Sequence, residues 1–221
     1  MVETIKADET RELFTDGIDV ALGAIFESDF LSQVPFAGMA VKSYQAAKVI
    51  QERMLIKKLA KFLYYPSQMS EAEKRKFSAQ FEDAEKEEEF GEQMLVLIDQ
   101  SEDTIKPEII GKLIHAHAKG HFDLAALMRL SKMVTRSFAE DLDYLKNMDG
   151  QHQRRDSDIE HSLNTVGFLR LKAYEYGQMG ESEIAPSDIG YEKTVYGTWV
   201  TELGLIEGPP PDPEEPNTLF S

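Results

Sequence analysis

Apolar residues recur at helical spacing through most of the first 148 residues, and this periodicity predicts a mainly α-helical fold. The clearest example lies between Arg53 and Leu63, where the apolar side chains fall on one arc of a helix and the basic side chains on the other. We expect this helix to begin near Ala37 and to end at Pro66. The apolar arc consists of Leu55, Ile56, Leu59, Phe62 and Leu63.

Capping signals and prolines predict the helices that follow. Ser70-Glu71-Ala72-Glu73 matches a capping box, in which the serine and the glutamate satisfy free backbone amides at a helix start. Pro107 suits the first turn of another helix, which Gly120 can close. One long helix is then predicted from Asp123 to the Asp149-Gly150 pair, because apolar residues keep helical spacing between these points.

The pattern changes after Gly150. A short helix is predicted over 159–166, an alternating strand over 167–174 and a second strand over 191–200. The last helix and the wing of a winged helix follow this same order of helix, strand, loop and strand. The predicted helix carries no lysine or arginine, so we interpret this module as a structural or protein-binding wing and not as a DNA reader.

These patterns divide the chain into three parts. Residues 1–148 are expected to form a multi-helix bundle, which includes an apolar and basic helical hairpin over 30–63. Residues 150–206 are expected to form a small α+β module that is winged-helix-like. Residues 207–221 are rich in proline and glutamate, and such a segment buries too little apolar area to order itself, so we expect a disordered, flexible acidic tail.

Composition limits the classes of function. The chain has no cysteine, which excludes disulfides, thiolate metal sites and cysteine nucleophiles and favours a reducing, cytoplasmic location. The formal net charge of −16 repels phosphate backbones, so no direct nucleic-acid binding is expected. The longest uncharged run near residue 30, Phe30–Val41, has 12 residues, whereas a spanning helix needs roughly 20. The N-terminus has no basic and apolar signal pattern, so we expect no secretory signal.

His117 and His121 are the candidate metal ligands, because their i, i+4 spacing can place two imidazoles on one metal. Gly120 is predicted to end the helix before His121. Ala118 and Lys119 stand where a metalloprotease would carry its glutamate. We therefore predict no metal and no other cofactor, and we interpret both histidines as ordinary residues of a helix end.

The polar residues do not belong to a catalytic sequence motif. The paired carboxylates, such as Asp141 with Asp143 and Asp156 with Asp158, are typical of a solvated face. The sequence has no Gly-x-Ser-x-Gly nucleophile elbow, no Walker loop and no Gly-x-Gly-x-x-Gly. We therefore predict that the protein is not an enzyme.

The basic amphipathic segment is the strongest candidate surface. Residues 42–62 carry a net charge of +5, whereas residues 181–221 carry −8. Two interpretations stay open: a core helix whose lysines meet acidic helices such as the run 82–89, or a hairpin that lies on an anionic membrane surface. The candidate residues for a membrane- or partner-facing surface are Phe36, Arg53, Lys57, Lys58, Lys61 and Phe62.

Four short strings of the sequence suggest a resemblance: Val34-Pro35-Phe36-Ala37-Gly38, the run Arg53 to Leu63, Gly167-Phe168-Leu169 and Thr201-Glu202-Leu203-Gly204. With them, the layout resembles that of poorly characterised bacterial and prophage proteins linked to abortive infection, which carry an N-terminal apolar hairpin, a helical bundle and a small winged-helix-like end. The resemblance implies a role in antiviral defence and offers no catalytic residues.

Three functional hypotheses follow. The first is a non-catalytic cytoplasmic protein that binds another protein, or a second copy of itself, in a bacterial or phage conflict. The alternative is a peripheral membrane effector that acts through residues 30–63. The second alternative is an acidic nucleic-acid mimic, which ranks third because half of the net charge lies in the last 41 residues, which are expected to be mostly flexible.

Overall fold

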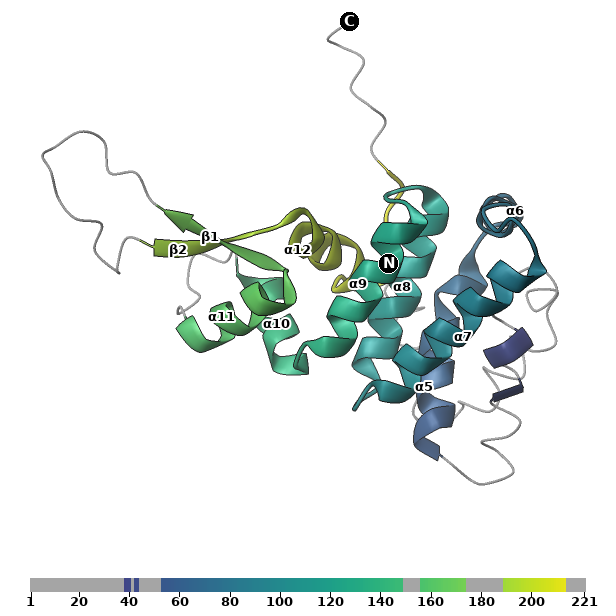
Figure 1. Cartoon of the computed structure of the whole chain (residues 1–221), viewed down its shortest axis with the longest axis horizontal. Helices are drawn as coiled ribbons and strands as arrows, with labels where there is room; N and C mark the ends of the chain where they lie inside the picture. The colour runs from purple at the N-terminus through teal and green to yellow at the C-terminus, as the bar shows by residue number, and fades with distance from the viewer. Residues whose placement is uncertain (1–37, 41, 44–52, 149–155, 174–188, 214–221) are drawn as a thin grey trace, which may run out of the picture.

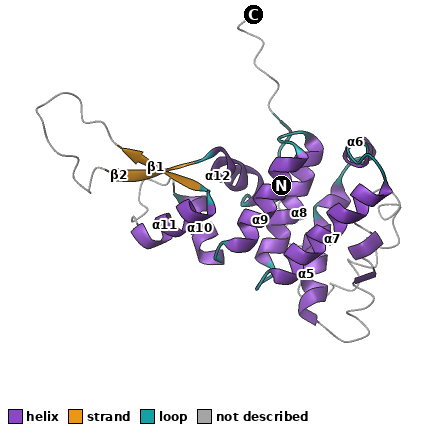
Figure 2. Cartoon of the chain, in the orientation of Figure 1, coloured by secondary structure: helices purple, strands orange, loops and turns teal. Residues whose placement is uncertain are grey.

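The computed structural model describes residues 38–40, 42–43, 53–148, 156–173 and 189–213 (Figure 1). These residues are mainly helical and include one two-stranded sheet, which confirms the predicted fold class in this coarse form (Figure 2). Most of the predicted hairpin over 30–63, including Phe36, lies outside the described residues. Gly38–Ala40, Lys42 and Ser43 are helical, and Ala40 is buried in the core.

The bounds of the described elements, in chain order, are α5 (Arg53–Tyr64), the 3-10 turn η1 (Pro66–Gln68), α6 (Glu71–Ser78), α7 (Ala84–Gln100), α8 (Ile105–Lys119), α9 (Leu124–Arg136), α10 (Ala139–Asn147), α11 (Ser157–Val166), β1 (Leu169–Ala173), β2 (Ile189–Lys193), α12 (Val195–Trp199) and the π-helical turn η3 (Val200–Gly204).

Helix α8 is the centre of the fold. Nearly every residue of α8 is buried, and α5, α6, α9 and η3 pack around it (Figure 1). The crossing of α5 over α8 is close because Gly111 has no side chain, and a Cβ there would overlap the carbonyl oxygen of Phe62. The largest fully buried side chains include Phe62, Phe77 and Phe168, so one core joins the bundle to the start of β1.

The structure confirms the predicted helix termini that depend on neighbouring residues. The Ser70 amide donates to Glu73 Oε2 over 2.6 Å and the Glu73 amide donates to Ser70 Oγ over 3.3 Å, which completes the capping box of α6. Gly120 ends α8 with φ of +102°, a left-handed conformation that favours glycine.

The single long helix predicted after Asp123 is wrong, because the chain breaks between α9 and α10. Ser137 adopts an extended conformation, and its hydroxyl donates to the Met133 carbonyl over 3.0 Å. The hydroxyl takes the place of the Ser137 amide, which a continuing helix would have bonded to Met133, so the helix can stop there.

The second predicted strand, 191–200, is also partly wrong, because β2 ends at Lys193 and residues 195–199 form α12. Thr194 causes the change: its hydroxyl donates to the Gly167 carbonyl over 2.8 Å and accepts from the Gly197 amide over 3.2 Å, which caps α12. The antiparallel pairing of β1 with β2 places Leu171 opposite Tyr191.

The described part of the predicted tail lies against the end of α8. Lys119, the last residue of α8, forms a 2.7 Å ion pair with Asp212. Just before the tail, the Ile206 carbonyl accepts from Lys112 in the middle of α8 over 2.6 Å. Pro210 is buried, and His121 bonds the carbonyl of Pro211 over 2.9 Å. Residues 214–221 lie outside the described part of the chain.

Candidate functional site

Two of the basic side chains of α5, those of Lys58 and Lys61, bond to other helices of the bundle. Phe62 is 0% exposed, so it does not lie on a surface. Lys58 is buried and donates to the Asp99 carbonyl at the end of α7 over 2.9 Å. Lys61 forms a 2.8 Å ion pair with Glu108 of α8. Lys57 is exposed, and Arg53 is the first residue of α5, with a side chain that lies outside the described part of the structure.

Glu108, which is half-buried, shows how strongly its ion pair with Lys61 is held. Burial alone would raise the pKa of its carboxyl group, but the hydrogen bond from Lys61 and the nearby ammonium group of Lys112 lower that pKa below its ordinary value. The glutamate is therefore ionised at neutral pH, and α5 is fixed to α8 through its polar face as well as its apolar face. Within the described ranges, no helix is both long and apolar enough to cross a membrane.

The two candidate metal ligands have separate partners. His117 is buried in α8, and its Nδ1 lies 2.7 Å from the carbonyl oxygen of Phe122. His121 follows Gly120 and uses Nε2 to bond the Pro211 carbonyl. The described residues hold no group of three or more histidine, aspartate or glutamate side chains placed to bind a metal.

His117 is held in its neutral form. A carbonyl only accepts, so Nδ1 carries the proton, while Nε2 is buried with no hydrogen-bond partner among the described residues. Burial lowers the pKa of the imidazole below its ordinary value of 6.5, although the bond to Phe122 opposes this effect. A proton added at Nε2 would place an unpartnered charge beside the ring of Phe77.

Acid should therefore destabilise the fold through His117. The imidazole binds a proton more readily in the unfolded chain, so the free energy of unfolding should fall as the pH drops below about 6.5. The variant His117→Asn keeps a donor for the Phe122 carbonyl and does not ionise, so it should lose less stability between pH 7 and pH 5. Urea denaturation at several pH values measures the difference. The matched variant His161→Asn, at an exposed position, should follow the wild-type profile, and equal slopes for all three proteins would contradict the assignment.

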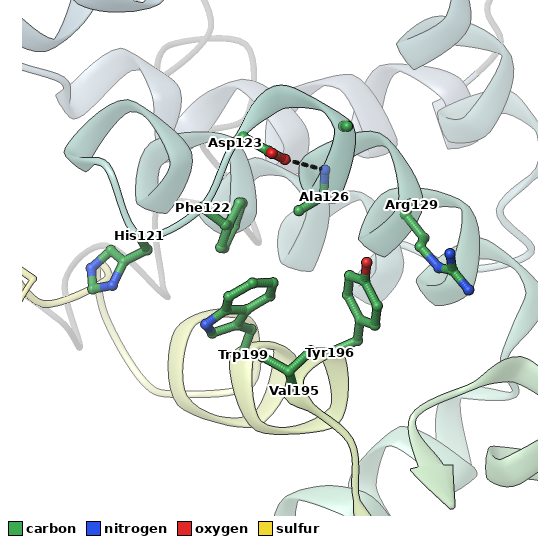
Figure 3. A pocket seen from close by; sticks show the side chains of 9 residues that line it. His121, Phe122, Asp123, Ala126, Arg129, Val195, Tyr196 and Trp199 are labelled. Atoms are coloured by element: carbon green, nitrogen blue, oxygen red, sulfur yellow. Dashed lines mark hydrogen bonds between the residues drawn. The ribbon is translucent and has the colours of Figure 1, made fainter.

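An open groove lies between the start of α9 and the short helix α12 (Figure 3). Its volume is about 450 Å³. The loop that follows α8 forms one wall, α9 the second and α12 the third. The lining residues are His121, Phe122, Asp123, Ala125, Ala126, Arg129, Val195, Tyr196 and Trp199.

Local chemistry fixes each wall of this groove. Asp123 caps α9 by accepting from the Ala126 amide over 2.8 Å. Gly197 allows α12 to pack directly on the Phe168 carbonyl, since a Cβ there would overlap that oxygen. Val200 and Leu203 of the following turn are buried, which anchors α12 to the core.

Aromatic rings and one guanidinium group form the face of the groove (Figure 3). The ring of Trp199 lies 5.2 Å from that of Phe122 and 5.7 Å, edge to face, from that of Tyr196. The exposed guanidinium group of Arg129 lies 5.0 Å from the centre of the Tyr196 ring. Such contacts hold the side chains in place before a ligand arrives, which lowers the entropic cost of binding.

The sequence pattern did not predict this groove. A strand over 191–200 would place Tyr196 and Trp199, three residues apart, on opposite faces, whereas a helix places them on one face. Their partners, Phe122 and Arg129, come from a segment about 70 residues earlier in the chain. The one usable signal was Trp199, the only tryptophan of the chain.

Comparison with protein-family models, with curated proteins and with solved structures finds no match to this chain.

Proposed function

We propose that the protein is a non-catalytic binding protein that takes up a segment of a partner protein in the groove between α9 and α12. The observation that carries this proposal is the lining of one open groove by Trp199, Tyr196 and Arg129. Tryptophan, tyrosine and arginine are the residues that most often supply the binding energy of protein interfaces. Buried and half-buried aromatic rings provide apolar area, and the exposed guanidinium group of Arg129 can pair with a carbonyl or carboxylate of the partner.

The polar residues of the groove support binding over catalysis. The Asp123 carboxylate is used to cap α9, and His121 Nε2 is used to bond a backbone carbonyl of the chain itself. A general base needs a partner oriented toward a nucleophile, and the lining residues include no serine, threonine or lysine. The proposal therefore needs no reaction, metal or cofactor.

The C-terminal module supports the groove in this proposal. We interpret α11, β1 and β2 as the last helix and wing of a winged-helix-like module, in which α11 carries no lysine or arginine. We assign this winged-helix-like module the role of holding α12 against α9, and not that of reading DNA. The partner that the layout resemblance implies is a cytoplasmic protein of a bacterium or of its phage, in antiviral defence.

Site-specific crosslinking tests the proposal. A photo-crosslinking amino acid at Val195, on the groove, should capture one partner in cells of the native host, whereas the same group at Leu171, on the wing, should not. The two positions are matched because their side chains are 54% and 59% exposed. The captured partner is then purified, and its binding is followed by the fluorescence of Trp199, which reports from inside the groove.

Removal of the guanidinium group should weaken that binding. Arg129→Ala is expected to raise the Kd of the purified partner about tenfold, the usual loss at a position that matters in an interface. Arg136→Ala, an exposed arginine at the end of the same helix, should leave the Kd unchanged. Equal crosslinking from Val195 and Leu171, or equal affinity of both arginine variants, would overturn the proposal.

A further inference from the structure

A second depression, which we call the α7 groove, lies where α7 meets the first turns of α9. Its volume is about 320 Å³. Its apolar lining is formed by Phe81, Phe90, Leu124 and Met128, and its polar lining includes Glu82 and Glu89. Leu124 and Met128 lie one residue before Ala125 and Arg129, so the two grooves occupy neighbouring faces of α9.

The phenylalanine and methionine side chains of this groove can hold an inserted apolar side chain of a partner. The rings of Phe81 and Phe90 lie 5.4 Å apart, and each contacts the buried ring of Phe77, so the inner wall is rigid. Met128 is half-buried and unbranched, and such a side chain adapts to the shape of an inserted group. A volume of about 320 Å³ accommodates one large side chain and its flanking residues, not a folded domain.

The border of the α7 groove is negatively charged. Glu82, just before α7, and Glu89 line the groove. Glu85 and Glu92 are exposed and lie four residues before and three residues after Glu89, which places them in one row with it along α7. Lys86 is the one basic residue among the described residues that line the groove, and it forms a 3.0 Å ion pair with Glu89. The row therefore presents a net negative charge beside an apolar floor.

We propose that the α7 groove binds a basic amphipathic helix of a partner protein, with one large apolar side chain inserted between Phe81, Phe90 and Met128. The glutamate row pairs with lysine or arginine residues on the flank of that helix, and the apolar floor takes its anchor. The basic helix α5 of this chain is not the occupant, because its apolar arc lies in the core and Lys58 and Lys61 are engaged there.

A designed peptide tests this assignment. The probe is an 18-residue helical peptide with lysines on one face and leucines with a central phenylalanine on the other, labelled with fluorescein and measured by anisotropy. We expect binding at 50 mM salt that weakens about tenfold at 300 mM salt, because the pairs are exposed. A matched peptide with glutamates in place of the lysines should not bind, and one with alanine in place of the phenylalanine should bind about tenfold more weakly.

Charge-reversal variants of the protein distinguish binding in the α7 groove from attraction to the net charge of the whole protein. The double variant Glu85→Lys with Glu89→Lys should weaken binding of the lysine peptide at least about tenfold. The control Glu140→Lys with Asp143→Lys changes the net charge equally at exposed positions of α10 and should leave the affinity unchanged. Arg129→Ala, which tests the groove between α9 and α12, should also leave it unchanged.

Three results would overturn the assignment. The first is no binding of the lysine peptide at 50 mM salt. The second is an equal loss of affinity in both charge-reversal variants, which would show attraction to the overall charge alone. The third is an equal affinity for the peptide without its phenylalanine, which would show that the apolar floor takes no anchor.

Discussion

Replacing Phe62 with alanine is expected to lower the free energy of unfolding by about 3–5 kcal/mol. The ring is fully buried where α5 packs on α8, and its removal leaves a cavity between two helices that are also joined by the ion pair of Lys61 with Glu108. That pair keeps the helices from closing the cavity, so the loss should lie in the upper part of the range for this substitution. Urea denaturation followed by circular dichroism measures it.

The control for this prediction lies on the same helix. Met54 is 51% exposed, and Met54→Ala should change the free energy of unfolding by no more than about 0.5 kcal/mol. A loss below about 1 kcal/mol in Phe62→Ala would contradict the core position. If wild type and Phe62→Ala then unfolded alike but bound anionic vesicles differently, Phe62 would be a membrane-facing residue, as the amphipathic pattern of residues 53–63 also allowed.

The sequence predicted best the features that depend on neighbouring residues. The capping box of Ser70 and Glu73 and the left-handed end at Gly120 each involve atoms within a few residues, so the signal is complete in the local sequence. The apolar arc of α5 was found for the same reason. Whether that arc meets a core or a membrane is decided by other helices, and the local pattern is identical in both cases.

The errors arose where distant residues decide the local structure. Residues 191–200 have the β-branched and aromatic composition of a strand, yet Thr194 turns the chain into α12 by donating to the Gly167 carbonyl, which lies 27 residues earlier. That single turn places Tyr196 and Trp199 on one face and creates the groove with Arg129. The candidate site could not be derived from the sequence because each of its walls depends on such a contact.

Replacing Gly111 with alanine is expected to lower the free energy of unfolding by about 3 kcal/mol. Two effects oppose each other at this position. Alanine favours a helix over glycine by about 1 kcal/mol, which would stabilise α8. A Cβ at Gly111, however, overlaps the Phe62 carbonyl oxygen and also approaches the ring of Pro66 at 3.4 Å. These are atoms of the backbone and of a closed ring, which cannot rotate away, so the steric cost should outweigh the gain.

Gly38 provides the matched comparison because it is helical and exposed, and a Cβ at this position would meet none of the described residues within 4 Å. Gly38→Ala should therefore show the helix preference alone, with no change or a gain of up to about 1 kcal/mol. Opposite signs for the two variants, measured by urea denaturation, would show that the close crossing of α5 over α8 determines the outcome at Gly111. A stabilised Gly111→Ala protein would mean that the two helices can separate at little cost.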